Sequence, residues 1–273
     1  MSLFSRKKKL IVSGCSYTDD YATTQNLKSF PLWPELLAEK LDMECINVGK
    51  VAFGNKAIYS TLIDQVVSQK NVGLAISMWS EFQRVSFYMG EGNLPKSIDE
   101  KMLWSCFHPD RDYLEGEWHD QFYDDAEKNP AKKDYVYKVS KVIRENGLGG
   151  MKGGTYDSIR MMYSFQTICE SLDIPHLQVQ GCIPIMSKTG NRGQKELCHY
   201  ILDSCYFDKI NKKTFLGWPI MPQISGTNID NHLDLIDPDR TALRISPEDV
   251  HPNEEAQEII SEILYDQYNK VYS

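Results

Sequence analysis

The segment 9-KLIVSGCSYTDDYA-22 brings a short apolar run to an abrupt stop at Gly14. Lys9–Ser13 is apolar and β-branched, which predicts a buried strand. Glycine allows a sharp turn and a close approach of another backbone or of a ligand. Cys15 and Ser16 therefore place two nucleophilic atoms directly behind a strand. By itself this arrangement fits a turn or a helix cap as well as a nucleophile loop.

Three further apolar segments predict strands, and helical patterns lie between them. The strands are expected at Glu44–Val48, Val72–Met78 and His176–Gln180. Apolar residues recur at helical spacing after Pro34, from Asn55, from Thr155, and from about Pro252 to Tyr268. This alternation predicts an α/β fold in which helices cover a parallel central sheet. In such sheets, sites form at the carboxyl ends of the strands.

The stretch from about residue 90 to 154 departs from this alternation. It is rich in charge, Trp and Tyr, and it closes with GLGGMKGG, which we interpret as a glycine hinge. A segment this long is usually functional, so we expect one domain over 1–273 with an insertion or lid at about 90–154. Several of its side chains are metal-ligand types in no recognised ligand pattern, and we interpret them as a solvated lid surface: His108, Asp110, Asp112, His119, Asp120, Asp124 and Asp125.

Composition limits the classes of protein. The 273 residues carry a net charge of −8, which argues against the basic face of a general nucleic-acid binder. The 7 cysteines are scattered without a C-x-x-C pair, which is typical of a reduced intracellular chain. Leu10–Val12 is too short for a signal-peptide core or a membrane span. We expect a cytoplasmic protein with no nucleic-acid or membrane partner; homo-oligomers and association with a virion or another larger particle stay open.

A second group of candidate residues follows the second predicted strand, in INVGKVAFGN at 46–55. Gly49 or Gly54 can present a backbone N–H there. Asn55 can present a side-chain amide, or cap the helix that begins at this point.

A third group lies before the last predicted helix, in SPEDVHPN at 246–253. A general base needs one ring nitrogen for the nucleophile and a carboxylate on the other, which fixes the tautomer. His251 suits this role, and both Glu248 and Asp249 stand close enough in sequence to hold it.

Together these motifs resemble the SGNH (GDSL-type) hydrolase superfamily. The match consists of Gly-x-Ser-x-Thr near the N-terminus, a glycine after the second strand and carboxylate-His-Pro-Asn before the C-terminal helix; it covers about 9–89 and 155–268. The resemblance implies a three-layer α/β/α flavodoxin-like fold and activity as an esterase, lipase, thioesterase or carbohydrate deacetylase. It implies no metal or organic cofactor.

The resemblance also assigns roles to individual residues. Ser16 matches the nucleophile, and its backbone N–H matches one oxyanion donor. Gly54, or Gly49 if the gap falls differently, matches the second donor. His251 matches the base.

Two departures from the family pattern stand out. The family usually places Asp three residues before the histidine, where this chain has Glu248; Asp249 is two residues before it. The family's third block is usually Gly-x-Asn-Asp, whose Asn completes the oxyanion hole, but this chain has ISMWSEFQR. Ser80, Asn55 or Arg84 can supply the missing donor or charge. The loss of one such donor costs about 3 kcal/mol of transition-state stabilisation. Trp-Ser with a following Arg resembles SGNH-like proteins of bacteriophage and marine microbial genomes.

The resemblance implies a serine esterase that cleaves a small-molecule ester or a carbohydrate O-acetyl ester. Tyr17, Trp79 and Arg84 are candidate substrate contacts. An alternative is a catalytically impaired SGNH-like module that binds carbohydrate or serves as a viral structural or accessory protein, which the missing Asn favours. A third hypothesis makes Cys15 the nucleophile, although its side chain should point away from that of Ser16.

Overall fold

The computed structural model describes residues 7–89, 104–109, 130–184 and 190–273. Its centre is a five-stranded sheet with the strand order β2-β1-β3-β6-β7, and every neighbouring pair is parallel. The predicted parallel α/β class is thereby confirmed. The strands are β1 (Lys9–Ser13), β2 (Glu44–Asn47), β3 (Val72–Trp79), β6 (His176–Gln180) and β7 (Phe215–Leu216).

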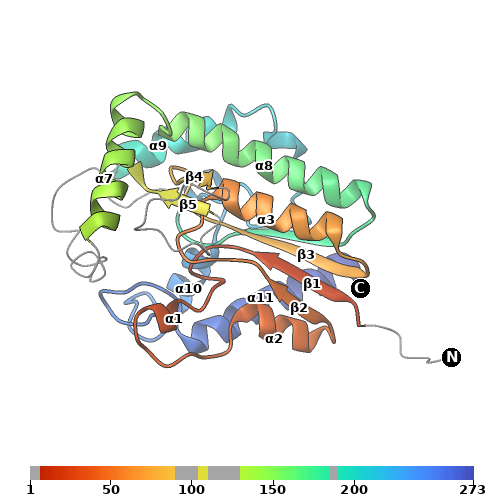
Figure 1. Cartoon of the computed structure of the whole chain (residues 1–273). Coiled ribbons are helices and arrows are strands. Elements are labelled where there is room, and N and C mark those ends of the chain that lie inside the picture. The colour runs from red at the N-terminus through yellow and green to blue at the C-terminus, as the bar shows by residue number, and fades with distance from the viewer. Residues whose placement is uncertain (1–6, 90–103, 110–129, 185–189) are drawn as a thin grey trace.

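Helices cover both faces of the sheet and make three layers (Figure 1). One face carries α3 (Asn55–Ser68), α8 (Met151–Ser171) and α9 (Gly190–Leu202). The other carries α2 (Trp33–Lys40), α10 (Ile229–Ile236) and α11 (Glu254–Tyr272). The short helix α1 (Tyr21–Thr24) follows the loop after β1.

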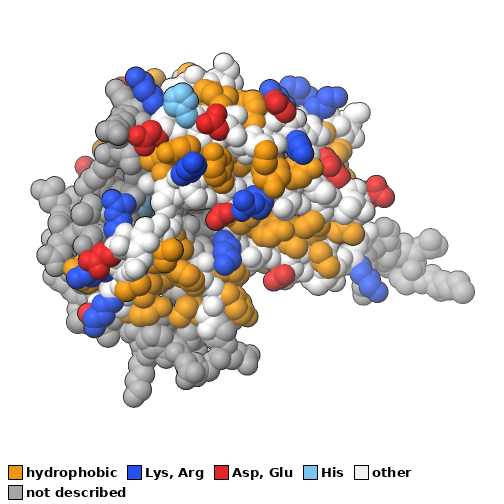
Figure 2. Space-filling model, turned by 90° about the horizontal axis from the view of Figure 1, so that it is seen from above, with side chains coloured by type: hydrophobic (Ala, Val, Ile, Leu, Met, Phe, Trp, Pro, Cys, Tyr) orange, Lys and Arg blue, Asp and Glu red, His pale blue; other side chains and the backbone are white. Residues whose placement is uncertain are grey.

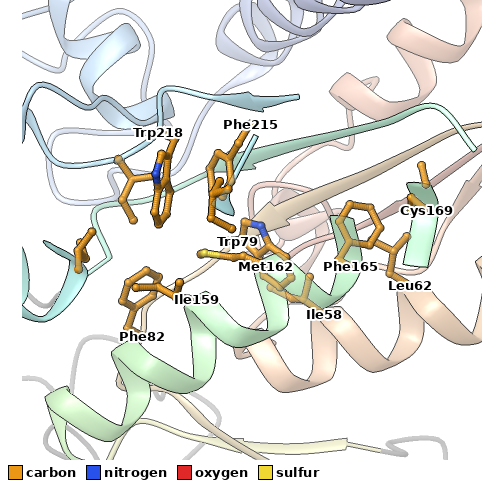
Figure 3. Packing of buried hydrophobic residues seen from close by; sticks show 14 of the residues in the cluster. Ile58, Leu62, Trp79, Phe82, Ile159, Met162, Phe165, Cys169, Phe215 and Trp218 are labelled. Atoms are coloured by element: carbon orange, nitrogen blue, oxygen red, sulfur yellow. The ribbon is translucent and has the colours of Figure 1, made fainter. Parts of the chain in front are cut away.

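The two layers of core explain why the central strands are apolar throughout. Ile11 and Ala75 face the cluster under α3 and α8, whereas Leu10 and Leu74 face the cluster under α2 and α11. A strand buried on both faces reads as a continuous apolar run. Figure 3 shows part of the first cluster, where buried aromatic and aliphatic side chains from β3, α3 and α8 pack together.

The strand order places a site at one edge of the sheet. The chain runs from β1 out to β2 and then back across β1 to β3, so α2 and α3 cover opposite faces. The crevice at such a reversal lies beyond the carboxyl ends of the two central strands. Ser13 at the end of β1 pairs with Ser77 of β3, so the loops that follow these strands lie side by side.

The predicted insertion is described only in part. Its β5 (Trp104–Phe107) pairs antiparallel with β4 (Val85–Tyr88), and α7 (Pro130–Glu145) follows. The predicted glycine hinge is divided: Gly147 and Gly149 have positive φ before α8, whereas Gly154 lies in the first turn of that helix. A Cβ at Gly154 would lie 2.1 Å from the carbonyl oxygen of Phe82, so helix α8 passes too close to that backbone for a side chain. Most candidates from the lid lie outside the described residues: Asp110, Asp112, His119, Asp120, Asp124 and Asp125.

The described surface carries charges of both signs. Figure 2 shows Lys and Arg interspersed with Asp and Glu on the face seen from above Figure 1. In the described parts of the chain, no helix combines the length and the apolar character that crossing a membrane requires.

A buried charge network joins the loop after β1 to α10. The Tyr17 hydroxyl donates to Asp230 at 2.7 Å, and Arg244 lies 3.2 Å from the same carboxylate and 2.8 Å from Asp234. The Arg244 side chain is only 1% exposed. Burial raises the pKa of Asp230, while the charge of Arg244 and the hydrogen bond from Tyr17 oppose that rise.

Replacing Arg244 should therefore destabilise the protein strongly. We expect Arg244→Met to lower the free energy of unfolding by about 3–5 kcal/mol, because Asp230 keeps its burial and loses its partner. The exposed Lys40–Glu262 pair offers a control, and Lys40→Met should cost no more than about 1 kcal/mol. Urea denaturation measures both. Equal losses in the two variants would show that Arg244 compensates no buried charge.

Candidate active site

The loop after β1 is built around close backbone contacts. The N–H groups of Thr18 and Asp19 donate to the Cys15 carbonyl at 2.9 and 3.2 Å, which closes a tight turn around Ser16. A Cβ at Gly14 would lie 2.1 Å from the Thr18 hydroxyl oxygen. A Cβ at Gly49 would lie 2.9 Å from the Gly14 nitrogen. These two glycines therefore let the loop after β2 lie directly against the turn that presents Ser16.

Ser16, His251 and Asp249 form a continuous hydrogen-bonded relay. Ser16 Oγ lies 2.9 Å from His251 Nε2, and Asp249 Oδ1 lies 2.6 Å from His251 Nδ1. The same Asp249 oxygen accepts the backbone N–H of His251 at 3.2 Å. Glu248 instead accepts the Ser246 hydroxyl at 3.0 Å. Of the two acids that the sequence leaves open, the structure brings Asp249 to the histidine.

Electrostatics keep Asp249 ionised. Burial alone would raise the pKa of this carboxyl group, but the hydrogen bond and charge of His251 and a hydrogen bond from Tyr21 outweigh burial and lower the pKa. An ionised carboxylate on Nδ1 fixes the imidazole tautomer that leaves Nε2 able to accept the Ser16 proton. The arrangement thus supplies a hydroxyl, a base and an orienting acid.

Sequence reasoning missed Tyr21. Its ring stacks on the imidazole of His251, with the ring centroids 3.6 Å apart and the planes 21° from parallel. Nothing in its spacing marks it, because the contact arises from the path of the chain after Asp20. The ring of Tyr17 meets the same imidazole edge-on, at a centroid distance of 5.7 Å.

Two predicted oxyanion donors, Asn55 and Ser80, are buried within the protein. Asn55 is 2% exposed, and its amide nitrogen donates to the Ser80 carbonyl at 3.2 Å and to the Ser158 hydroxyl at 2.8 Å. Its amide oxygen accepts the Ser80 N–H at 2.8 Å. The prediction that Asn55 donates to an oxyanion is therefore corrected, because both of its N–H groups have internal partners. The fully buried Ser80 hydroxyl lies against the Cys15 thiol and helps to lower the pKa of that thiol.

The two candidate glycines also have other partners. The Gly49 N–H donates to the side chain of Asn47 at 3.0 Å. The Gly54 N–H faces the thiol of Cys106 in β5, where it moderates the rise in thiol pKa that burial causes. A Cβ at Gly54 would lie 2.7 Å from the Arg84 carbonyl oxygen. Gly54 is thus explained by the close approach of the β4–β5 hairpin, and the structure directs its N–H toward that hairpin.

Cys15 is buried beneath Ser16. It is 2% exposed, and its Sγ lies 3.9 Å from Ser16 Oγ. A hydrogen bond with the Cys182 thiol and the charge of Arg84 lower the pKa of Cys15 despite its burial. The imidazole nitrogen points at the hydroxyl of Ser16, so the geometry favours oxygen over sulfur as the nucleophile.

The predicted substrate contacts are mostly covered. Trp79 is fully buried in the core, and Tyr17 is 3% exposed with its hydroxyl on Asp230, so the prediction that these two touch substrate is corrected. The side chain of Arg84 is 12% exposed. Its guanidinium donates to the Phe53 carbonyl at 3.1 Å and pairs with Glu81. Within the described residues, no group of three His, Cys, Asp or Glu side chains is placed to hold a metal ion.

Comparisons with known proteins give remote structural likenesses. No protein-family model and no curated protein matches the chain. A protein assigned to the G-D-S-L lipolytic family of Desulfitobacterium hafniense is 14% identical, with a TM-score of 0.48 over 95% of this chain and 99% of that one. The psychrotrophic esterase EstA of Pseudoalteromonas sp. is 13% identical (TM-score 0.46, 97% and 98%), and TesA is 10% identical (TM-score 0.47, 97% and 99%). The first of these names the family that the motifs resemble. At these identities and TM-scores the comparisons support no further conclusion.

Replacing Asn55 should test its scaffold role. We expect Asn55→Leu to destabilise the protein by about 1–3 kcal/mol for each buried group left unpaired, beginning with the Ser80 N–H. Asn146→Leu, at the exposed residue directly after α7, is the control and should change stability by about 0.5 kcal/mol or less. Thermal and urea unfolding measure both variants. An Asn55→Leu protein as stable as the control would remove the basis for this role.

Proposed function

We propose that the chain is a serine ester hydrolase of the SGNH type. The observation that supports this proposal is the hydrogen-bonded order Ser16–His251–Asp249 at the carboxyl edge of the sheet. A nucleophile in contact with a base, which is itself oriented by an acid, is the arrangement that acyl transfer requires. Ser16 and the His251–Asp249 pair come from two loops far apart in sequence, so local chain geometry alone does not bring the serine to the histidine.

The mechanism follows from this order. Ser16 Oγ attacks the ester carbonyl carbon while His251 Nε2 takes its proton, and Asp249 stabilises the imidazolium. Collapse of the tetrahedral intermediate breaks the bond to the leaving alcohol, which receives the proton from His251. Water, deprotonated by His251, then attacks the acyl-enzyme and releases the acid and free Ser16. The Ser16 N–H donates to the oxyanion. The charge of Arg84 stabilises the same oxyanion, because electrostatic attraction is stronger in a partly buried site than in water.

The finer proposal concerns the substrate. Phe87 and Tyr88 of β4 are 42% and 61% exposed, and Tyr88 packs edge-on against Trp104 of β5. This hairpin follows Arg84 directly and lies against Gly54 at the start of α3. Exposed aromatic rings suit the apolar faces of sugars, which supports a carbohydrate O-acetyl ester over a long acyl chain.

A specific observation also favours the alternative of an impaired, carbohydrate-binding module. Of the expected donors, Asn55 has both amide N–H groups bonded within the protein, the Gly54 N–H faces the Cys106 thiol, and the Ser80 hydroxyl is fully buried. Each missing oxyanion donor lowers kcat by about 10²–10³-fold. In this alternative, the relay remains while turnover is largely lost.

A covalent probe separates these two functions. We expect a fluorophosphonate to label the protein and Ser16→Ala to abolish labelling, because the probe needs an activated hydroxyl. Cys15→Ala is the matched control at the neighbouring position and should keep its label. Hydrolysis of p-nitrophenyl acetate and of an acetylated oligosaccharide is measured in parallel. Labelling without turnover supports the impaired module, and the absence of both excludes the hydrolase.

The two neighbouring acids should behave differently. We expect Asp249→Asn to lower kcat by about 10²–10⁴-fold, because the imidazole loses the carboxylate that fixes its tautomer. Glu248→Gln should stay within about twofold, since its carboxylate contacts Ser246 at an exposed position. Because the pKa of Asp249 is lowered, the acid supports the base throughout the range above its usual pKa of about 4. A larger loss in Glu248→Gln would reverse this assignment.

A further inference from the structure

Tyr21 contacts both members of the base–acid pair. Its ring lies face to face with the imidazole of His251 at a centroid distance of 3.6 Å, and a hydrogen bond from its side chain helps to lower the pKa of Asp249. The residue is 7% exposed, so its ring is part of the interior rather than a surface group. One side chain thus covers one face of the imidazole and acts on the carboxylate that orients it.

The chain before Tyr21 fixes its position. The Tyr21 N–H donates to the Asp19 carbonyl at 2.7 Å. The Asp19 carboxylate accepts the Val51 N–H at 3.0 Å and pairs with Lys50 at 3.1 Å. This segment is therefore fastened to the loop after β2 immediately before Tyr21.

Asp20, the residue directly before Tyr21, anchors the chain that follows. Asp20 caps α1, because its carboxylate accepts the Thr23 N–H at 3.2 Å and the Thr23 hydroxyl at 2.6 Å. The Ser29 hydroxyl donates to the same carboxylate at 2.9 Å. A four-residue helix has little stability of its own, so these contacts set the direction of the Tyr21 ring.

The stacked Tyr21 ring restrains the imidazole of His251. A ring in contact with one face of the imidazole restricts its rotation and shields that face from water, which strengthens the Asp249–His251 hydrogen bond. The ring face also attracts the imidazolium that forms when His251 takes the serine proton. The phenol hydrogen bond holds the carboxylate in the orientation that the imidazole needs.

We propose that Tyr21 is a positioning residue of the relay, acting on Ser16 through His251 and Asp249. This inference rests on the proposed serine hydrolysis, and it adds a fourth residue that neither the motifs nor the comparisons assign. Tyr21 does not touch the nucleophile; its effect is on how well the base is held.

Two substitutions separate the ring from the hydroxyl. We expect Tyr21→Leu to lower kcat and the rate of fluorophosphonate labelling by about 10–100-fold with KM changed by about threefold or less, because general-base catalysis depends on a positioned imidazole. Tyr21→Phe keeps the stack and should restore most of that loss, remaining about 3–10-fold below the parent because one charge-assisted hydrogen bond is missing. Tyr163→Leu in α8 is the control for loss of a partly buried tyrosine and should keep its kcat.

Proton NMR supplies a readout that does not need turnover. The proton between His251 Nδ1 and Asp249 should give a far-downfield signal in the parent, in Tyr163→Leu and, at a changed shift, in Tyr21→Phe. It should vanish through exchange with water in Tyr21→Leu. A downfield signal and a kcat that both survive Tyr21→Leu would overturn the inference. If the parent has no turnover, the hydrolase proposal fails, and the NMR signal alone decides the role of Tyr21.

Discussion

The arrangement of the candidate site depends on Tyr17 being held at both ends. Its hydroxyl donates to Asp230, and its backbone carbonyl accepts the side-chain amide of Gln257 at 3.3 Å. The amide oxygen of Gln257 in turn accepts the backbone N–H of Trp33 at 3.0 Å. The loop that presents Ser16 is therefore fixed to α10, α11 and α2 at once. Because Gln257 is 2% exposed, these bonds are shielded from water, and breaking one leaves a buried polar group unpaired.

The same connections explain why two distant segments meet at a hydrogen-bonding distance. His251 stands just before α11, whose N-terminus is capped by Asn253 through the Ala256 N–H at 3.1 Å. The Asn253 amide also donates to the Ala242 carbonyl at 2.7 Å. The histidine loop is thus fastened to the start of α11, and α11 is fastened to the serine loop through Gln257. Because both loops are anchored, the surrounding structure fixes the 2.9 Å separation between Ser16 Oγ and His251 Nε2.

Sequence patterns predicted the sheet because its central strands are buried on both faces and carry uninterrupted apolar runs. The pairing of Ser16 with His251 came instead from the resemblance of the motifs, because His251 precedes a helix and follows no predicted strand. The choice of acid depended instead on a turn: Ser246 donates to Glu248 and so leaves Asp249 for His251. Residue type could not reveal this. Likewise the glycine at 54 has two possible physical reasons, and only the position of the β4–β5 hairpin distinguishes them.

The structure separates nucleophile activation from oxyanion stabilisation. The relay is complete, but the β4–β5 hairpin lies against Gly54, and Arg84 is already paired with Glu81. Arg84 also lowers the pKa of Cys15, directly beneath Ser16. A thiolate at Cys15 would neutralise part of the charge that an oxyanion needs, whereas a neutral thiol would leave it available. In the hydrolase that we propose, the rate of turnover therefore depends on the charge balance around Arg84 as much as on the serine–histidine contact.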